Sequence, residues 1–382
     1  MNFSTVHLNN KMADLTTTQA QFALDLMRAV GDVENEAFLS PVSIAIALAM
    51  TYAGVDGKTK SQMNNVMFGG LSDEEVHLRF AEIRHWLSEP NDGYHLFAAN
   101  RLYAQKDFKL VPEFLDVLSK HYRSELHTVD FTTDAENVAT EINDFVSHAT
   151  ANHINMLLGP GVLDAMTRLV LINAIYFKGD WVHQFDASRT QKNTFYSGPN
   201  NEKQVDMMVL KNKFLYAEDV DVQVLGMPYK GEDLHMFAFL PKERNGLAHF
   251  EKELSGERLL ALIRSTRKTD VTVHFPKFKM EQSFKLNDAL SSLGMTDLFD
   301  QEKADLSKIT GDKDLFVSAV IHKAFIEVNE QGSEAAAATA VTMGLRCMPM
   351  APPKQIIFTA DHPFNFIIGN VDGHLLFLGR YV

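Results

Sequence analysis

The sequence predicts an α+β domain with a large hydrophobic core. Amphipathic helical segments and apolar strand segments alternate irregularly along the 382 residues, unlike the regular series of a parallel α/β fold. The composition, 46% apolar and 22% charged, is that of a globular protein. Because no repeat, low-complexity linker or long block of charge divides the chain, we expect a single domain over residues 1–382.

Three segments near the beginning of the chain carry helical patterns. Residues 16–18 are threonines that can cap a helix, because apolar residues recur at helical spacing after them. These apolar residues are Phe22, Ala23, Leu26, Met27 and Val30. The very apolar segment 42–53 is typical of a buried helix, and residues 73–87 predict a helix with one apolar stripe.

Four further segments carry strand patterns. Residues 169–177 are nearly all apolar and rich in branched side chains, which predicts a central strand covered on both faces. Residues 271–275 alternate with period two, as in a strand buried on one side. The apolar segments 364–368 and 375–378 are separated by Asn370-Val-Asp-Gly373, which indicates a hairpin.

Composition also excludes several functions. The formal net charge of −13, with 36 basic and 49 acidic residues, argues against a nucleic-acid surface. No apolar run reaches membrane-spanning length, and the first twenty residues lack a signal peptide. We expect a protein that is either cytoplasmic or secreted with its signal removed. The single cysteine, Cys347, permits no internal disulfide and leaves the compartment open.

The sequence contains no convincing catalytic, cofactor or metal motif. Gly57-Lys-Thr59 imitates the end of a phosphate-binding loop, but Tyr52 occupies the position of the required earlier glycine. No G-x-S-x-G elbow, H-E-x-x-H motif or paired-cysteine spacing occurs. Cys347 lies among methionines and prolines, with no helix start beside it to lower its pKa. We therefore expect no enzyme, no cofactor and no metal.

One segment does not fit its surroundings. Residues 332–353 read GSEAAAATAVTMGLRCMPMAPP: helix formers come first, then β-branched residues, then methionine, glycine and proline. Such a conflict between local propensity and context is expected at functional sites. Without further information, the same composition also fits an ordinary surface loop.

Several motifs, in order along the chain, resemble those of the serpins, a family of protease inhibitors. Residues 328–339, VNEQGSEAAAAT, resemble the hinge of inhibitory serpins, and residues 358–366, FTADHPFNF, resemble the family signature. Further matches are Phe38–Ser43, Gly57–Gln62, Leu171–Trp181 and Phe275–Phe278, so the resemblance covers roughly residues 16–382.

The resemblance implies a serpin fold with three β-sheets, eight or nine helices and an exposed reactive centre loop at about residues 332–354. It implies a monomeric suicide inhibitor: a protease cleaves the loop, forms an acyl-enzyme, and is trapped when the loop inserts as a new strand into the main sheet. The implied hinge residues are Glu330, Gly332, Ser333, Glu334, Ala335, Ala336, Ala337, Ala338 and Thr339.

The hinge residues themselves suit insertion. In a strand, alternate side chains point to opposite faces, so Ser333, Ala335, Ala337 and Thr339 would share one face. These side chains are small and uncharged, and they can enter a core without the cost of burying a charge. Glu334 falls on the other face, which we expect to remain in water.

The resemblance also indicates the scissile bond. In serpins this bond usually follows the residue sixteen positions after the hinge glutamate, here Arg346, with Cys347 on the leaving side. An arginine suits a trypsin-like pocket with a carboxylate at its base. Because the stretch from Arg346 to Pro363 is longer than in many members, cleavage at Leu345-Arg346 or Cys347-Met348 stays open.

Other family positions can be assigned by resemblance. Ser40, Ser43, Asn173 and His322 match the shutter, a hydrogen-bonded cluster beneath the main sheet, and Trp181 matches the breach, where the loop enters. Asn152 stands where many members have glycine. The helix over residues 73–87 corresponds to the heparin-binding helix of some members, but its acidic residues argue against a heparin site here.

The leading hypothesis is therefore an inhibitor whose partner is a trypsin-like serine protease. Two alternatives stay open: a non-inhibitory serpin that acts as a carrier or chaperone, and a cross-class inhibitor of papain-like cysteine proteases. The intact small-residue hinge argues against the first alternative.

Overall fold

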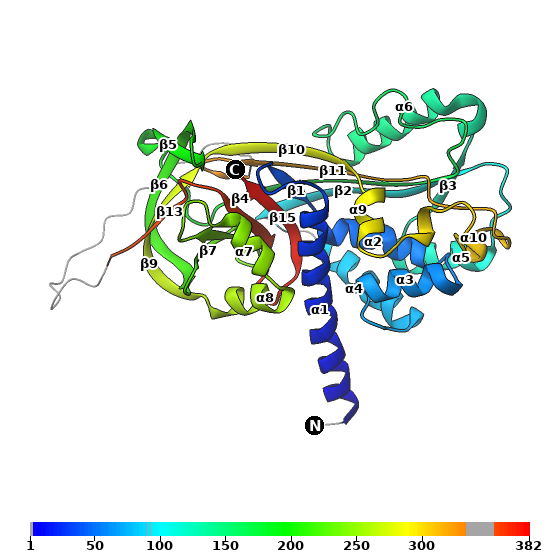
Figure 1. The fold of residues 1–382 in the computed structure, drawn as a ribbon, viewed down its shortest axis with the longest axis horizontal. Helices are drawn as coiled ribbons and strands as arrows, with labels where there is room; N and C mark the ends of the chain where they lie inside the picture. Colours follow the sequence, from blue (N-terminus) through cyan, green and yellow to red (C-terminus); the bar gives the residue numbers. More distant parts are fainter. Residues whose placement is uncertain (1–2, 90, 92, 334–354) are drawn as a thin grey trace.

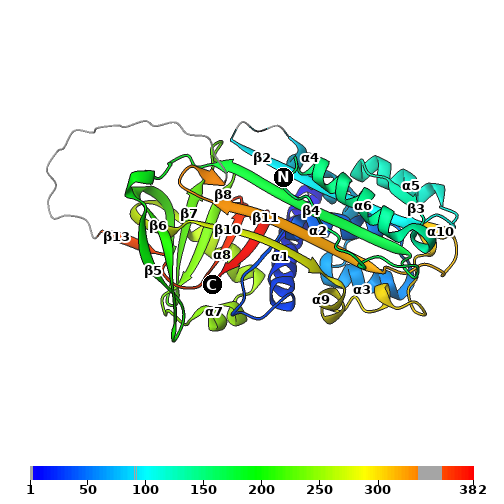
Figure 2. The ribbon, with the colours of Figure 1, turned by 90° about the horizontal axis from the view of Figure 1, so that it is seen from above.

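A six-stranded sheet runs through the middle of the molecule (Figures 1 and 2). The computed structural model describes residues 3–89, 91, 93–333 and 355–382. The strands of this sheet, which we call the main sheet, lie in the order β10 (Phe278–Lys285), β11 (Ala319–Val328), β4 (Leu169–Asp180), β2 (Tyr94–Gln105) and β3 (Leu126–Val129), and β12 (Gly332–Ser333) pairs with β4. Its two central strands, β11 and β4, run parallel.

A nine-stranded sheet lies at one end of the main sheet (Figure 1). Its strands are β1 (Ala37–Leu39), β15 (Leu375–Tyr381), β14 (Phe364–Gly369), β8 (His235–Pro241), β7 (Val222–Pro228), β6 (Asn201–Glu218), β9 (Arg267–Pro276) and β13 (Ile356–Thr359), with β5 (Gln191–Gly198) paired to β6. The predicted C-terminal hairpin is present as β14 and β15, and Gly373 in its turn has a φ of 100°.

The helices cover both faces of the main sheet. They are α1 (Phe3–Ala29), α2 (Pro41–Tyr52), α3 (Gly57–Met67), α4 (Asp73–Ser88), α5 (Pro112–Val117), α6 (Phe131–Ala149), α7 (Leu247–Glu253), α8 (Gly256–Ser265), α9 (Asn287–Ser292) and α10 (Ser307–Thr310), with a π-helical turn η1 (Leu118–Tyr122) and 3₁₀ turns η2 (Ala187–Arg189) and η3 (Asp297–Phe299). Helix α6 lies alone on one face, and α2 to α5 lie beneath the other (Figure 1).

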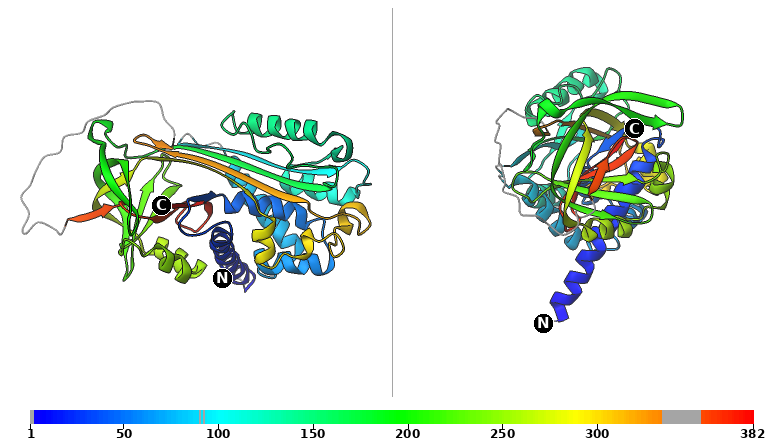
Figure 3. Two further views of the ribbon diagram at one scale, coloured as in Figure 1. Left: turned by 45° about the horizontal axis from the view of Figure 1, so that its top comes forward. Right: turned by 90° about the vertical axis from the view of Figure 1, so that its left-hand side faces the viewer.

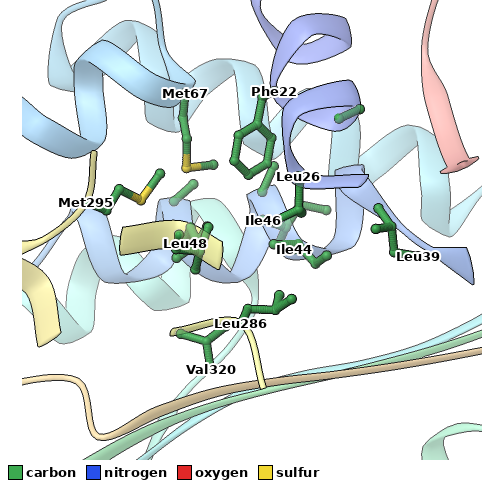
Figure 4. Packing of buried hydrophobic residues seen from close by; sticks show 14 of the residues in the cluster. Phe22, Leu26, Leu39, Ile44, Ile46, Leu48, Met67, Leu286, Met295 and Val320 are labelled. Atoms are coloured by element: carbon green, nitrogen blue, oxygen red, sulfur yellow. The ribbon is translucent and has the colours of Figure 1, made fainter. Parts of the chain in front are cut away.

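The predicted central strand is β4, and both of its faces are buried. Val170, Ile172 and Ala174 point toward α6 and pack with its apolar residues. Leu169 and Leu171 point the other way, into the core formed with α1 and α2. Figure 4 shows that core, in which Phe22 and Leu26 of α1 meet Ile44 and Leu48 of α2.

The other sequence predictions agree with the structure except at one helix start. Helices α2 and α4 cover the predicted segments 42–53 and 73–87 to within one residue at the C-terminal end, and β9 alternates buried and half-buried residues as predicted. Ser40 caps α2, and Ser72 and Glu75 form a capping box on α4. Helix α1, however, begins at Phe3, so the prediction that residues 16–18 cap it is wrong. The helix continues through these threonines, and its first turns extend away from the sheets (Figure 3).

The α+β class is confirmed, although the numbers of sheets and helices differ from the expectation. Within the described residues, hydrogen bonds join the strands into two sheets where three were expected. The 18-residue strand β6 joins strands that would otherwise lie in separate sheets. Its first part pairs with β5, its middle with β9 and its end with β7. The same residues form ten α-helices, of which α10 spans only four residues. A search of the described helices finds none long and apolar enough to cross a membrane.

Candidate functional site

The structure places the predicted site residues in two groups along β4. Ser40, Ser43, Asn173 and His322 lie together beneath the middle of the main sheet, and Trp181, Glu330 and Gly332 lie at the end of the sheet next to β12. The predicted scissile bond at Arg346 and Cys347 lies outside the described residues. The hinge residues Glu334, Ala335, Ala336, Ala337, Ala338 and Thr339 also lie outside them.

The first group forms a continuous hydrogen-bonded cluster that joins three elements. His322 of β11 lies opposite Asn173 of β4, and its Nδ1 is hydrogen-bonded to the Asn173 Oδ1. The amide of Asn173 donates to the Ser43 Oγ at 2.6 Å, which brings in helix α2. The backbone N–H of Ser40 donates to the His322 Nε2 at 3.1 Å and closes the cluster.

These contacts require a neutral His322. The Asn173 Oδ1 is an acceptor, so Nδ1 carries the proton, and Nε2 accepts from a backbone N–H and must keep its lone pair. The residue is fully buried, and burial lowers the pKa of His322 to about 3. Protonation of the His322 Nε2 would place its N–H against the backbone N–H of Ser40, and this hydrogen bond would be lost.

Asn100 of β2 belongs to the same cluster, although the sequence analysis did not identify it. It lies opposite Asn173, and its Oδ1 accepts from the Asn173 amide and from the Ser43 hydroxyl, the latter at 3.2 Å. Asn100 is half-buried, and it lies in a strand without a family motif. The only sequence signal was a polar amide that follows the apolar residues 96–99.

The second group holds the chain just before the loop. The Trp181 ring stacks on Tyr229 with 4.4 Å between ring centroids, and its Nε1 donates to the Asn329 carbonyl at 3.0 Å. The Trp181 backbone N–H donates to the Gln331 carbonyl at 2.8 Å. The Phe185 backbone N–H donates to the Glu330 carbonyl at 2.8 Å. The carbonyls of three consecutive residues, 329–331, are thus hydrogen-bonded, which fixes the position of the chain before the loop.

Glu330 is held by its side chain as well. Its carboxylate lies 2.9 Å from the Lys277 Nζ and accepts from the Thr190 hydroxyl at 2.9 Å. Burial alone would raise the pKa of Glu330, but the hydrogen bonds from Lys277 and Thr190 outweigh it, so the pKa lies below its ordinary value. Glu330 is therefore charged and immobilised at neutral pH.

Strand β12 enters the main sheet at the point where its central strands separate. Paired residues of β11 and β4 run from Ala319 and Val170 to Phe325 and Tyr176. Beyond them, Gly332 pairs antiparallel with Asp180. A Cβ at Gly332 would lie 2.0 Å from the Gly179 carbonyl oxygen, and Gly332 has a φ of 152°, so only glycine fits there.

Asn152, which stands where many serpins have glycine, also has a backbone conformation that favours glycine. It has a φ of 64°, which is the left-handed conformation that asparagine tolerates better than most residues. The described residues contain no group of three or more histidine, cysteine, aspartate or glutamate side chains that could hold a metal ion.

Comparison with known proteins agrees with this geometry. A model of the family described as "Serpin (serine protease inhibitor)" matches residues 17–382. The chain is 41% identical to the leukocyte elastase inhibitor of Equus caballus over 97% of this chain and 99% of that protein. It is 39% identical to Serpin B6 of Macaca fascicularis over 96% of this chain and 98% of that protein.

The structure also resembles solved structures. The crystal structure of uncleaved ovalbumin matches with a TM-score of 0.85 and 30% identity, covering 96% of this chain and 99% of that one. The similarity extends across the helices and both sheets, so it confirms the fold implied by the sequence motifs.

Removing the Asn173 amide should destabilise the protein. Asn173→Ala leaves the buried His322 Nδ1–H without its acceptor, which costs about 1–3 kcal/mol. We expect a lower thermal midpoint and faster polymerisation on mild heating, measured by circular dichroism and native gels. Asn193→Ala, on the exposed face of β5, is the control and should change stability by less than about 0.5 kcal/mol. An unchanged midpoint for Asn173→Ala would argue against the cluster's role.

The cluster should also make stability depend on pH. In the unfolded chain His322 titrates near 6.5, whereas the folded protein binds that proton only near pH 3. The native state therefore loses stability as the pH falls below 6.5, by about 1.4 kcal/mol per pH unit, and nothing is lost above neutrality.

A neutral variant isolates this contribution, since His77 and His235, with pKa values of about 4, add losses of the same sign. The stability advantage of the wild type over His322→Gln should shrink by about 2 kcal/mol between pH 7.5 and pH 5 in urea titrations. A constant advantage across that range would show that the native His322 accepts a proton.

Proposed function

This chain belongs to the serpin family of serine protease inhibitors, and we propose that it is a suicide inhibitor that traps trypsin-like serine proteases. The observation that carries the proposal is the start of β12 on β4. The hinge already pairs antiparallel with β4 at Gly332 and Asp180, at the point where β4 and β11 separate. Continued pairing in the same direction would lead the loop between these two strands.

The register gives each inserted residue a partner. Gly332 pairs with Asp180 and Ser333 with Gly179, so Ala335 would meet Phe177, and Ala337 would meet Ile175. Phe177 and Ile175 are fully buried in the core between the two sheets. Small apolar side chains on this face can therefore enter without displacing charged groups.

The opposite face is less open than the sequence suggested. In the same register Ala336 would meet Tyr176, and Ala338 would meet Ala174, both fully buried beneath α6. Only Glu334 would meet a half-exposed residue, Lys178, which offers it an opposite charge. In this register Glu334 would be the residue of this face that stays near solvent, and the alanines suit both faces of the sheet.

Insertion changes the strand arrangement in a favourable direction. A new strand between β11 and β4 would replace one parallel pairing with two antiparallel ones, which are slightly more stable per residue. Insertion also brings loop backbone groups from water into sheet hydrogen bonds. To pass the row of residue 339, insertion must also separate His322 from Asn173, so the cluster would resist opening of the sheet at its middle.

The proposed trapping chemistry is ordinary acyl transfer. The protease serine attacks the Arg346 carbonyl, the bond to Cys347 breaks, and the new amino terminus on Cys347 takes the proton that the protease histidine removed from the serine. Arg346 stays joined to the protease as an ester. Insertion carries this ester away from Cys347 and distorts the protease before water can hydrolyse the ester.

A second candidate target follows from the relatives. Those at about 40% identity are named leukocyte elastase inhibitors, and an elastase pocket accepts small side chains. Cleavage after Cys347 would provide one. The trypsin-like assignment is favoured here because Arg346 carries the only positive charge between Gly332 and Lys354.

Reversing the charge of the bait residue should separate these targets. Arg346→Glu would place a carboxylate against the carboxylate of a trypsin-like pocket, so inhibition of trypsin should fall by at least about a hundredfold in association rate. Thermal stability should stay unchanged. Inhibition of elastase should persist if Cys347 is its bait. Undiminished inhibition of trypsin would show that Arg346 does not occupy the specificity pocket.

Burying a charge in the inserted strand should convert the inhibitor into a substrate. Ala337→Asp would set a carboxylate against Ile175, at a cost of several kcal/mol. We expect cleavage after Arg346, release of active protease and no complex on a denaturing gel.

Ala351→Asp is the matched control, since it makes the same change in the same loop on the side that leaves after cleavage. Its stoichiometry of inhibition should equal that of the wild type. Equal stoichiometry for both variants would contradict the insertion register, whereas a wild type that forms no complex with any protease would favour a non-inhibitory carrier or chaperone.

A further inference from the structure

A cavity of about 560 Å³ lies beside the main sheet, away from the loop. Its walls come from α2, α4, β2, β3 and α6, together with the residues that follow the turn η1. This volume lies within the range of small-molecule sites. None of the functions argued above uses it.

The cavity concentrates positive charge in an acidic protein. Three arginines line it, Arg84 of α4, Arg101 of β2 and Arg123 after η1, whereas Glu125 is its only acidic lining residue. Across the described parts of the chain, no carboxylate lies within ion-pair distance of these three guanidinium groups. Burial and the nearby charge of Arg123 lower the pKa of Arg84, so Arg84 and Arg123 repel each other. An anion in the cavity would relieve this repulsion.

The backbone holds one of these arginines in an unusual conformation. Arg123 follows the π-helical turn η1 and has a left-handed backbone, with φ 47° and ψ 39°. π-helical turns and left-handed non-glycine residues are both uncommon, and both are enriched at functional sites. Glycine or asparagine would adopt this backbone conformation with less strain, yet the position holds a charged residue that lines the cavity.

Another part of the lining is apolar. Ile46 and Met50 of α2, Leu87 of α4 and Leu96 of β2 line the cavity. Phe145 of α6 completes this surface, and the Arg101 guanidinium stacks on it with 3.5 Å from the guanidinium carbon to the ring centroid. An occupant thus needs an apolar body next to a negative group.

We propose that this cavity binds a monomeric anionic amphiphile, a carboxylate with an apolar chain of fatty-acid type. The three arginines would bind the carboxylate, and the apolar residues would cover the chain. Asn100 also lines the cavity, and its amide Nδ2 has no hydrogen-bond partner among the described residues, whereas its Oδ1 accepts from Asn173 and Ser43. The carboxylate can accept from this amide.

Through Asn100, the cavity shares a residue with the cluster that closes the main sheet. A ligand bound to the present arrangement of Asn100 stabilises that arrangement by mass action. Insertion of the loop separates β4 from β11 and disturbs the cluster, so the ligand should oppose insertion. This consequence rests on the proposed inhibitory function, whereas binding itself does not.

Calorimetric titration with dodecanoate, below its micelle concentration, tests the site. We expect one saturable site, with affinity at least about tenfold weaker in Arg84→Gln, Arg101→Gln and Arg123→Asn. Asparagine tolerates the left-handed backbone, so Arg123→Asn removes the charge and keeps the turn. Lys120→Gln, an exposed charge on η1 outside the cavity lining, should bind as the wild type does.

Neutral dodecanol should bind at least about tenfold more weakly than dodecanoate, because it cannot use the arginines. Saturable binding that is unchanged in all three arginine variants, or equal for dodecanol, would overturn the proposal, as would an absence of binding to the wild type. Thermal melts without ligand show whether each variant is folded. With binding intact, an unchanged stoichiometry of protease inhibition would overturn only the coupling to the main sheet.

Discussion

The hydrogen bond between His322 and Asn173 is the contact on which the rest of the structure depends. It joins the two parallel central strands of the main sheet at the row where Asn100 also lies. Above and below this row, β4 is apolar, with Ile175 in the core between the sheets and Leu171 in the core formed with the helices. The polar row thus lies where two hydrophobic cores meet, and buried polar groups are stable only while every partner is present. Any movement that separates β4 from β11 along their whole paired length must break this bond.

This arrangement explains how one sequence can hold a closed sheet that has a more stable alternative. Insertion of residues 334–343 would exchange water for sheet hydrogen bonds at about 1 kcal/mol each, on the order of 10 kcal/mol in total. The anchors just before the loop fix the point at which that exchange would start, because Trp181 holds the carbonyls of Asn329 and Gln331, and Lys277 holds the Glu330 carboxylate. The energy difference is large, but the opening of the strands is local and must break specific contacts. In the proposed mechanism, cleavage would free the far end of the loop and leave these anchors in place as the starting point of the new strand.

Sequence reasoning succeeded where a local pattern specifies the structure, and it failed where distant elements decide it. The apolar run of β4, the buried helix α2 and the C-terminal hairpin each follow from neighbouring residues. Asn100 could not be predicted, because its role comes from its register opposite Asn173, which no local pattern encodes. The cover over Ala174 and Tyr176 was also missed: the alternation of the hinge gives two faces, but only the position of α6 shows that both are buried. The start of α1 was misplaced because threonines that can cap a helix can also continue one.

The cluster has a side that solvent cannot reach and, at Asn100, a side that solvent can reach. On the side of β11, Asn173 and His322 are fully buried, so another molecule can reach them only when the two strands separate. On the side of β2, Asn100 is half-buried and lines the arginine-rich cavity, so a molecule in solution can reach it while the sheet is closed. Because hydrogen bonds in one network polarise one another, a partner on the Asn100 amide strengthens its carbonyl as an acceptor for Asn173. The proposed ligand in the cavity would therefore affect the hydrogen bond between Asn100 and Asn173 directly. Asn100 is the only residue needed to connect the two, because it lines the cavity and also belongs to the cluster.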